Sequence, residues 1–182
     1  MGLRPAKTCR DVNKPSWTRH SKRRPRKSFI KAMPHNTLLH FNMGKDKEDY
    51  EVEVRLITLG AIQIRDNALE STRMTVHKYM QKAAPEDYKF RIHVFPHQVI
   101  RENKMLTGAG ADRIQGGMKA PFGKPIDRAA RLRKNQTIFS IKTRKKNIKH
   151  VKAAYKRAQG KLSGDYRIET IEIGGWIWQT GL

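Results

Sequence analysis

The segment 101–125 combines glycines with cations, and this combination suits contact with phosphate groups. It holds five glycines and five Lys or Arg residues. Glycines let backbone amides approach a ligand closely, and the cations supply charge for phosphates. A patternless stretch of this length is uncommon inside a compact domain and is usually functional or disordered. We therefore interpret 101–125 as an extended glycine-rich loop whose candidate contact residues are Arg101, Lys104, Gly108, Gly110, Arg113, Gly116, Gly117, Lys119 and Lys124.

Two nucleotide-binding motifs fail on spacing in this loop. Gly108-x-Gly110 is followed by Arg113 where a dinucleotide fingerprint needs its third glycine, and Gly123-Lys124 is followed by Pro125 where a Walker loop needs Ser or Thr. The chain has 16 Asp and Glu residues, and we find no paired carboxylates among them for general acid–base catalysis. We also find no Ser/His/Asp set for nucleophilic catalysis in the sequence. An RNA- or nucleotide-dependent enzyme that uses the loop as a phosphate cradle is therefore only the alternative hypothesis.

Metal and cofactor sites are not predicted. Cys9 is the single cysteine, which excludes a cysteine-based zinc site and favours a reducing, cytosolic compartment. His93 and His97 lie in a stretch that alternates like a strand. Four strand steps separate them by roughly 13 Å, too far for one ion.

The charge of the chain points to a polyanionic partner. Its 182 residues include 39 Lys and Arg, giving a formal net charge of +23. The isoelectric point is about 10.6 and the mean hydropathy is −0.75. A compact chain with this surplus repels itself unless a polyanion neutralises it. Nucleic acid is the leading candidate, ahead of an anionic membrane surface and an acidic protein; no apolar run approaches the ~20 residues of a membrane span.

Residues 1–36 form a basic N-terminal extension in our reading. Its first 31 residues contain eleven Lys or Arg and one acid, Asp11. Such a segment is poorly ordered by itself, and a merely solubilising tail is the alternative. Trp17 favours RNA contact, because an indole among cations suits stacking on a base. The predicted RNA contacts here are Arg4, Lys7, Arg10, Trp17, Arg19, Lys22, Arg23, Arg24, Arg26 and Lys27.

Residues 37–173 show the patterns of an α+β domain, and 174–182 form a tail. Strands are expected around 37–43, 52–56, 62–65, 88–94, 137–143 and 166–173. One helix is predicted from a capping box of Asn67 and Glu70 to Pro85, and a second over 144–161. This order predicts two helices packed on one face of a mixed or antiparallel sheet.

The second helix has a row of lysines on its outer face: Lys145, Lys149, Lys152 and Lys156. Segment 135–162 holds nine basic residues and no acid. Like charges four residues apart destabilise a helix by a few tenths of a kcal/mol, a cost that facing phosphates would offset. A solvated face is the alternative. Neither helix has the mixed Arg/Asn/Gln face of a DNA reader, so DNA is not an expected partner.

Several motifs resemble one ribosomal protein family. They are 95–105, which reads Phe-Pro-His-Gln-Val-Ile-Arg-Glu-Asn-Lys-Met, and 107–113, which reads Thr-Gly-Ala-Gly-Ala-Asp-Arg. Arg4-Pro5-Ala6-Lys7, 63–70 and Phe122-Gly123-Lys124-Pro125 are similar to it as well. The family is universal protein sixteen of the large subunit, in its archaeal and eukaryotic "ten-e" branch, and the likeness spans about 4–173. Thr8-Cys9 and Asp127-Arg128 depart from its usual pattern.

The resemblance implies an α/β-hammerhead fold and a structural role in the cytoplasmic ribosome. It implies binding to 23S rRNA below the central protuberance, with 5S rRNA nearby and other large-subunit proteins as neighbours. Loop 101–125 would reach toward the peptidyl-transferase centre and A- and P-site tRNA, and the protein would join the subunit late. Arg65 completes the predicted RNA contacts, with Lys145, Lys149, Lys152 and Lys156.

Overall fold

The computed structural model describes residues 29–30, 32–47, 49–106, 108–110, 113 and 116–173. The arm contacts predicted from Arg4 to Lys27 and the tail 174–182 lie outside the described residues.

The larger sheet has five strands in the order β1-β4-β7-β2-β8. Their bounds are β1 Asn42–Gly44, β2 Val52–Thr58, β4 Tyr88–Ile92, β7 Thr137–Thr143 and β8 Tyr166–Glu172. Each pairing between them is antiparallel. The central strands β7 and β2 are rich in β-branched and aromatic residues, which favour extended backbone.

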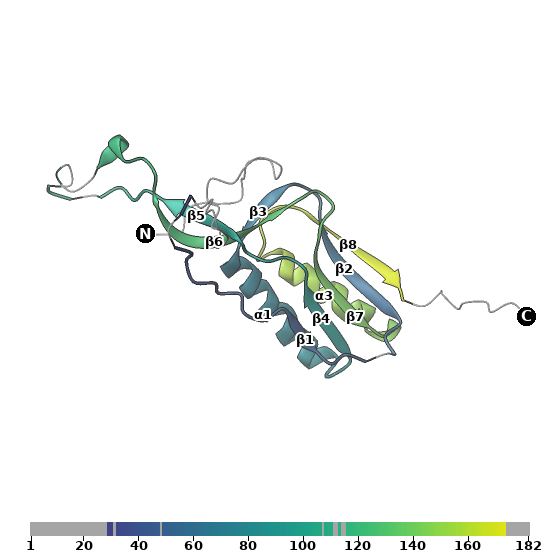
Figure 1. Ribbon diagram of the computed structural model, residues 1–182. Helices are drawn as coiled ribbons and strands as arrows, with labels where there is room; N and C mark the ends of the chain where they lie inside the picture. Colours follow the sequence, from purple (N-terminus) through teal and green to yellow (C-terminus); the bar gives the residue numbers. More distant parts are fainter. Residues whose placement is uncertain are drawn as a thin grey trace, which may run out of the picture.

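A smaller sheet of three antiparallel strands follows the order β3-β6-β5. Its strands are β3 Ile62–Arg65, β5 Gln98–Glu102 and β6 Lys124–Leu132. β5 and β6 form a long hairpin whose connection carries the short 3₁₀ helix η1, Gly117–Lys119. Figure 1 shows this hairpin projecting from one end of the molecule, away from the helices.

Two helices cover one face of the five-stranded sheet (Figure 1). They are α1, Asp66–Ala83, and α3, Ile148–Gln159, which directly follows the 3₁₀ turn η2, Lys145–Asn147. Val76 of α1 and Val151 of α3 are fully buried in the same core as Leu56 of β2. The predicted α+β class with two helices on a sheet is therefore confirmed.

Buried aromatic residues fix the helices to the sheet. The rings of Phe90 on β4 and Phe139 on β7 lie 5.5 Å apart at the centre of the core. Tyr155 of α3 is fully buried, and its hydroxyl donates a hydrogen bond to the carbonyl oxygen of Val54 at 3.1 Å. A buried hydroxyl without a partner is costly, so this bond restricts how α3 sits on β2.

The predicted capping box at the start of α1 is wrong. The helix begins two residues earlier than that box requires, with Arg65 instead of Asn67 at the N-cap position, in extended conformation and without a side-chain cap. Asp66 instead accepts a hydrogen bond from the amide of Asn67 at 2.9 Å. A carboxylate in the first turn also interacts favourably with the helix dipole, so α1 starts without the predicted box.

The prediction that 101–125 contains no regular element is also wrong at its two ends. Arg101 and Glu102 belong to β5, and Lys124 and Pro125 belong to β6. β6 is not predicted from the sequence because it is poor in β-branched residues and contains Pro125. Its position between β3 and β5 provides ladder hydrogen bonds on both sides, which outweigh weak propensity.

Gly123 sits where the two arms of the hairpin press together. A Cβ atom at this position would lie 2.1 Å from the carbonyl carbon of Glu102 and 2.4 Å from the amide nitrogen of Asn103. Both obstacles are backbone atoms, so a side chain would force the arms apart. The hairpin neck therefore requires glycine here.

We expect Gly123→Ala to destabilise the protein by about 1–3 kcal/mol, the usual cost of overpacking. Gly116→Ala is the matched control, because a Cβ there would meet the Cβ of Ala120 at an ordinary 3.4 Å. Chemical denaturation measures both variants. Equal stability of Gly123→Ala and wild type would contradict the close approach.

Candidate RNA-binding surfaces

Three lysines of the predicted row form an exposed cationic face on α3, which we call the lysine face: Lys149, Lys152 and Lys156. They lie opposite the buried side of the helix, where Val151, Ala154, Tyr155 and Ala158 enter the core. Among the described residues, no carboxylate forms an ion pair with any of the three. The face therefore offers unneutralised charge to an outside partner.

Lys145 differs from the other lysines of that row. It lies in η2, ahead of α3, and its ammonium group is 3.0 Å from a carboxylate oxygen of Glu172. Its backbone amide also donates to a carboxylate oxygen of Glu51 at 3.0 Å. The hydrogen bond to Glu172 and the charge of that residue raise the pKa of Lys145. Lys145 thus has acidic partners that the lysine face lacks.

Arg157 extends the lysine face toward α1. Its guanidinium lies 4.5 Å from the ring centroid of Tyr79, across the seam between the two helices. A cation over an aromatic face is held there by the ring quadrupole, so Arg157 has a preferred position while its side chain stays exposed. Arg157 was not among the predicted RNA contacts, because its position does not continue the helical spacing of the lysine row.

The hairpin forms a second cationic surface. Lys104, Arg113, Lys119 and Lys124 are exposed along it, and Arg101 is half-buried at its base. Gly108, Gly110 and Gly117 have φ values of 150°, 77° and 52°, a region that disfavours other residues, while Gly116 does not. The hairpin thus brings together the cations and glycines predicted for the loop and presents them beyond the folded body.

Arg65 has an internal partner instead of an open face. Its side chain is only 11% exposed, and its Nη1 lies 2.7 Å from Oδ2 of Asp127 on β6. The same cluster holds the chain that precedes β1. The amide of Thr37 donates to Asp66 at 2.9 Å, and Nε of Arg128 donates to the carbonyl of Pro34 at 2.6 Å. Arg65 therefore helps to tie α1, β6 and this segment together.

The acidic residues gather at the opposite end, where β1 turns into β2. Asp87 accepts from Lys47 at 3.0 Å and lies 3.2 Å from the ammonium of Lys146. Those two hydrogen bonds lower the pKa of Asp87. Lys45 pairs with Glu86 at 2.7 Å in the same region. Acids thus neutralise cations at this end, whereas no described carboxylate forms an ion pair with the lysine face.

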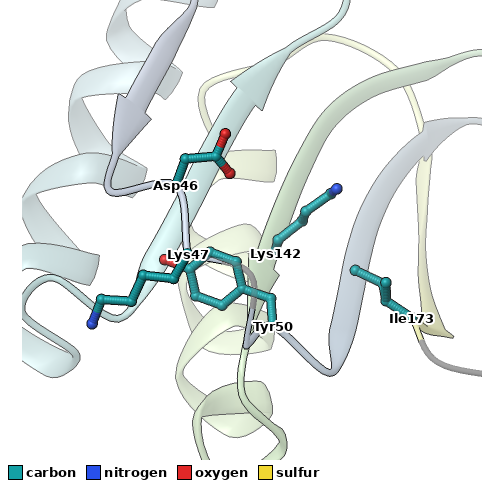
Figure 2. Close-up of a pocket in the computed structure, with 5 residues that line it drawn as sticks. All are labelled: Asp46, Lys47, Tyr50, Lys142 and Ile173. Atoms are coloured by element: carbon teal, nitrogen blue, oxygen red, sulfur yellow. The ribbon is translucent and has the colours of Figure 1, made fainter.

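A hollow of about 370 Å³ opens beside these acids and is drawn in Figure 2. Asp46, Lys47, Tyr50, Lys142 and Ile173 line it. The Tyr50 hydroxyl donates to the carbonyl of Lys45 at 2.6 Å, and burial, followed by the charges of Asp87 and Asp46, raises its pKa. Its lining residues include no histidine or cysteine.

His93 and His97 have separate partners. Nε2 of His93 is 2.7 Å from the Ser140 hydroxyl, and Nδ1 of His97 is 3.0 Å from the carbonyl of Phe95. Within the described ranges, three potential metal-ligating side chains of the His, Cys, Asp or Glu type do not come together anywhere. The described helices also include none with the length and apolar character needed to cross a membrane.

A small α+β body with exposed cations on a helix face and on a projecting hairpin is typical of a basic, polyanion-binding class of protein. Comparison with known proteins narrows the class. The family model for ribosomal protein L16p/L10e matches residues 16–169. The chain belongs to this family, and it is accordingly a ribosomal protein, a structural component of the large subunit and not an enzyme.

Archaeal relatives agree over nearly the whole chain. The chain is 47% identical over 163 residues to the large ribosomal subunit protein uL16 of Methanococcus aeolicus, covering 89% of this chain and 90% of that one. It is 37% identical to uL16 of Haloarcula marismortui, covering 93% and 94%. It is 38% identical to uL16 of Staphylothermus marinus, covering 92% and 93%. The resemblance seen in the sequence motifs is therefore confirmed.

Replacing Lys149, Lys152 and Lys156 together with Gln should weaken RNA binding and flatten its salt dependence. Each lost phosphate contact removes about 0.7–0.9 from the slope of log K against log salt. The matched control replaces Lys45, Lys47 and Lys146 with Gln, because each of these has an acidic partner. Filter binding to large-subunit rRNA at several salt concentrations gives both slopes. Equal slopes for the two triple variants would remove the lysine face from the interface.

The partly buried carboxyl of Asp127 should make stability depend on pH. Burial, then the hydrogen bond and charge of Asp66, raise its pKa despite the opposing effect of Arg65. Just above the ordinary aspartate value of 3.8, the folded protein keeps a proton that the unfolded chain has released. The free energy of unfolding therefore falls as pH rises through the raised pKa.

Asp127→Asn should lose this fall, although loss of the Arg65 pair lowers its stability overall. Urea denaturation in steps between about pH 3.5 and 7 compares the two profiles. Parallel profiles would show that Asp127 does not bind this proton.

Proposed function

We propose that this chain binds 23S rRNA near the peptidyl-transferase centre and the central protuberance, with its hairpin directed toward A- and P-site tRNA. The predicted arm contacts from Arg4 to Lys27, the lysine face and the hairpin then meet RNA from several sides. Folded RNA contacted through phosphates and 2′-hydroxyls suits surfaces of this kind. Proximity to 5S rRNA, contacts with other subunit proteins and late entry into the subunit belong to the same proposal.

The hairpin is the observation that carries the proposal. It places four exposed cations at a distance from the body, where the acids of the β1–β2 end do not neutralise them. A globular protein that only filled a gap between RNA helices would not need such an extension. The lysine face supports anchoring to rRNA, which leaves the hairpin available for a second RNA. Arg65 and Lys145 are not used in this proposal, since both have internal acidic partners.

The test separates anchoring from tRNA contact. Deleting 105–121 removes the end of the hairpin while keeping β5 and β6. Large subunits that lack their own family member are reconstituted with wild type or with the deletion variant, and sedimented in moderate and high salt. We expect both proteins to sediment with subunits in moderate salt and to dissociate in high salt.

Binding of A- and P-site tRNA to the reconstituted ribosomes is then measured. The deletion should weaken tRNA binding about tenfold, the effect of losing contacts worth about 1.4 kcal/mol. The triple Gln variant of the lysine face is the control, because it should weaken subunit association instead. Unchanged tRNA affinity with the deletion variant would contradict the role of the hairpin.

A further inference from the structure

The hairpin contains an exposed apolar groove, a feature that marks a binding site on the surface of a protein. The groove lies at the hairpin neck and has a volume of about 590 Å³, within the range of small-ligand sites. Its apolar lining includes Leu106, Phe122 and Ile126, which are 47%, 76% and 37% exposed. Three such side chains around one hollow form a patch, unlike scattered single apolar residues.

Phe122 is presented as a flat platform. The guanidinium of Arg101 lies 5.1 Å from the centroid of its ring, so a cation engages the ring from one direction. The neighbouring Gly123 is pressed against the backbone of Glu102 and Asn103, which fixes the chain where Phe122 emerges. The ring therefore stays exposed on a constrained piece of backbone.

Charge around the groove identifies the kind of ligand. Lys104 and Lys124 line it, and Arg101 stands behind the aromatic ring. The carboxylate in the lining belongs to Glu102, whose position in the ladder is directly opposite Lys124. An apolar floor with cationic walls matches a nucleotide, which has a π-face and an adjacent phosphate.

We propose that this groove binds one unpaired RNA base, stacked on Phe122, with the flanking phosphates at Lys104 and Lys124. The inference rests on the proposed RNA-binding function and adds a site that recognises an unpaired base. Cationic walls favour this ligand over an apolar peptide, whose backbone offers them no charge. An unpaired base gains stacking on the Phe122 ring, whereas a paired base is already stacked on its neighbours in the helix. The site therefore distinguishes loops and bulges from duplex RNA.

The experiment uses the full chain and an RNA hexamer with 2-aminopurine at one central position. Anisotropy gives affinity, and stacking on Phe122 quenches the fluorescence of 2-aminopurine. Phe122→Ala should bind about tenfold more weakly, within the usual effect of removing one stacking side chain, and should lose the quenching. Phe122→Tyr should stay within about twofold of wild type, because it keeps the ring.

Two controls separate stacking from other effects. Met118→Ala removes an apolar side chain that is 85% exposed on the same hairpin but is not among the residues lining the groove, and it should bind like wild type. Phe122→Leu keeps an apolar group without the ring, and it should behave like the Ala variant. A hexamer in which all six positions are abasic should bind wild type and Phe122→Ala equally.

The outcomes distinguish this site from the general RNA-binding role. Equal binding of the 2-aminopurine hexamer by wild type and Phe122→Ala overturns the base site, while salt-dependent binding by both keeps the proposed function. Equal weakening by Phe122→Ala on the fully abasic hexamer also overturns the site, because that hexamer has no base to stack on the ring. Binding of neither hexamer by any variant overturns the site, whereas the proposed function fails only if the protein does not sediment with large subunits in moderate salt.

Discussion

Repulsion among the surplus cations is the constraint on which this molecule depends. The chain has 39 Lys and Arg residues against 16 Asp and Glu, so internal pairing cannot neutralise most of its positive charge. The fold concentrates ion pairs such as Asp87 with Lys47 at the β1–β2 end. It leaves the lysine face without a carboxylate partner among the described residues, and it gives the hairpin more cations than acids. Association with a polyanion relieves the repulsion. For a ribosomal protein, that polyanion is ribosomal RNA.

The two sheets divide the work of presenting this charge. The five-stranded sheet, with Phe90 and Phe139 at its centre, holds α3 so that its lysines point outward. The three-stranded sheet holds the base of the hairpin, where Gly123 allows its arms to touch. A change in the core therefore acts on the lysine face, whereas a change at the neck acts on the hairpin. The groove beside Phe122 depends on the second sheet alone.

Sequence reasoning succeeded where a pattern repeats and failed where contacts are long-range. The strand at 137–143 was predicted with its observed bounds, because apolar residues crowd it. The strands β5 and β6 were missed because each is stabilised by its partner more than by its own residues. Helical spacing was enough to predict that Lys149, Lys152 and Lys156 are exposed. The ion pair of Arg65 could not be predicted, because its partner Asp127 lies 62 positions away in the sequence. Phe122 had no periodic neighbours that would have singled it out.

The hydrogen bonds from Thr37 to Asp66 and from Arg128 to Pro34 fix where the described segment before β1 lies. They hold the root of the basic extension against β6, the same strand that forms one side of the hairpin. Each residue of an extended chain spans at most ~3.3–3.6 Å, so positions just before Pro34 cannot travel far from that strand. The segment that leads into β1 and one side of the hairpin therefore share a single strand as their anchor. A change that displaced β6 would move both of them together.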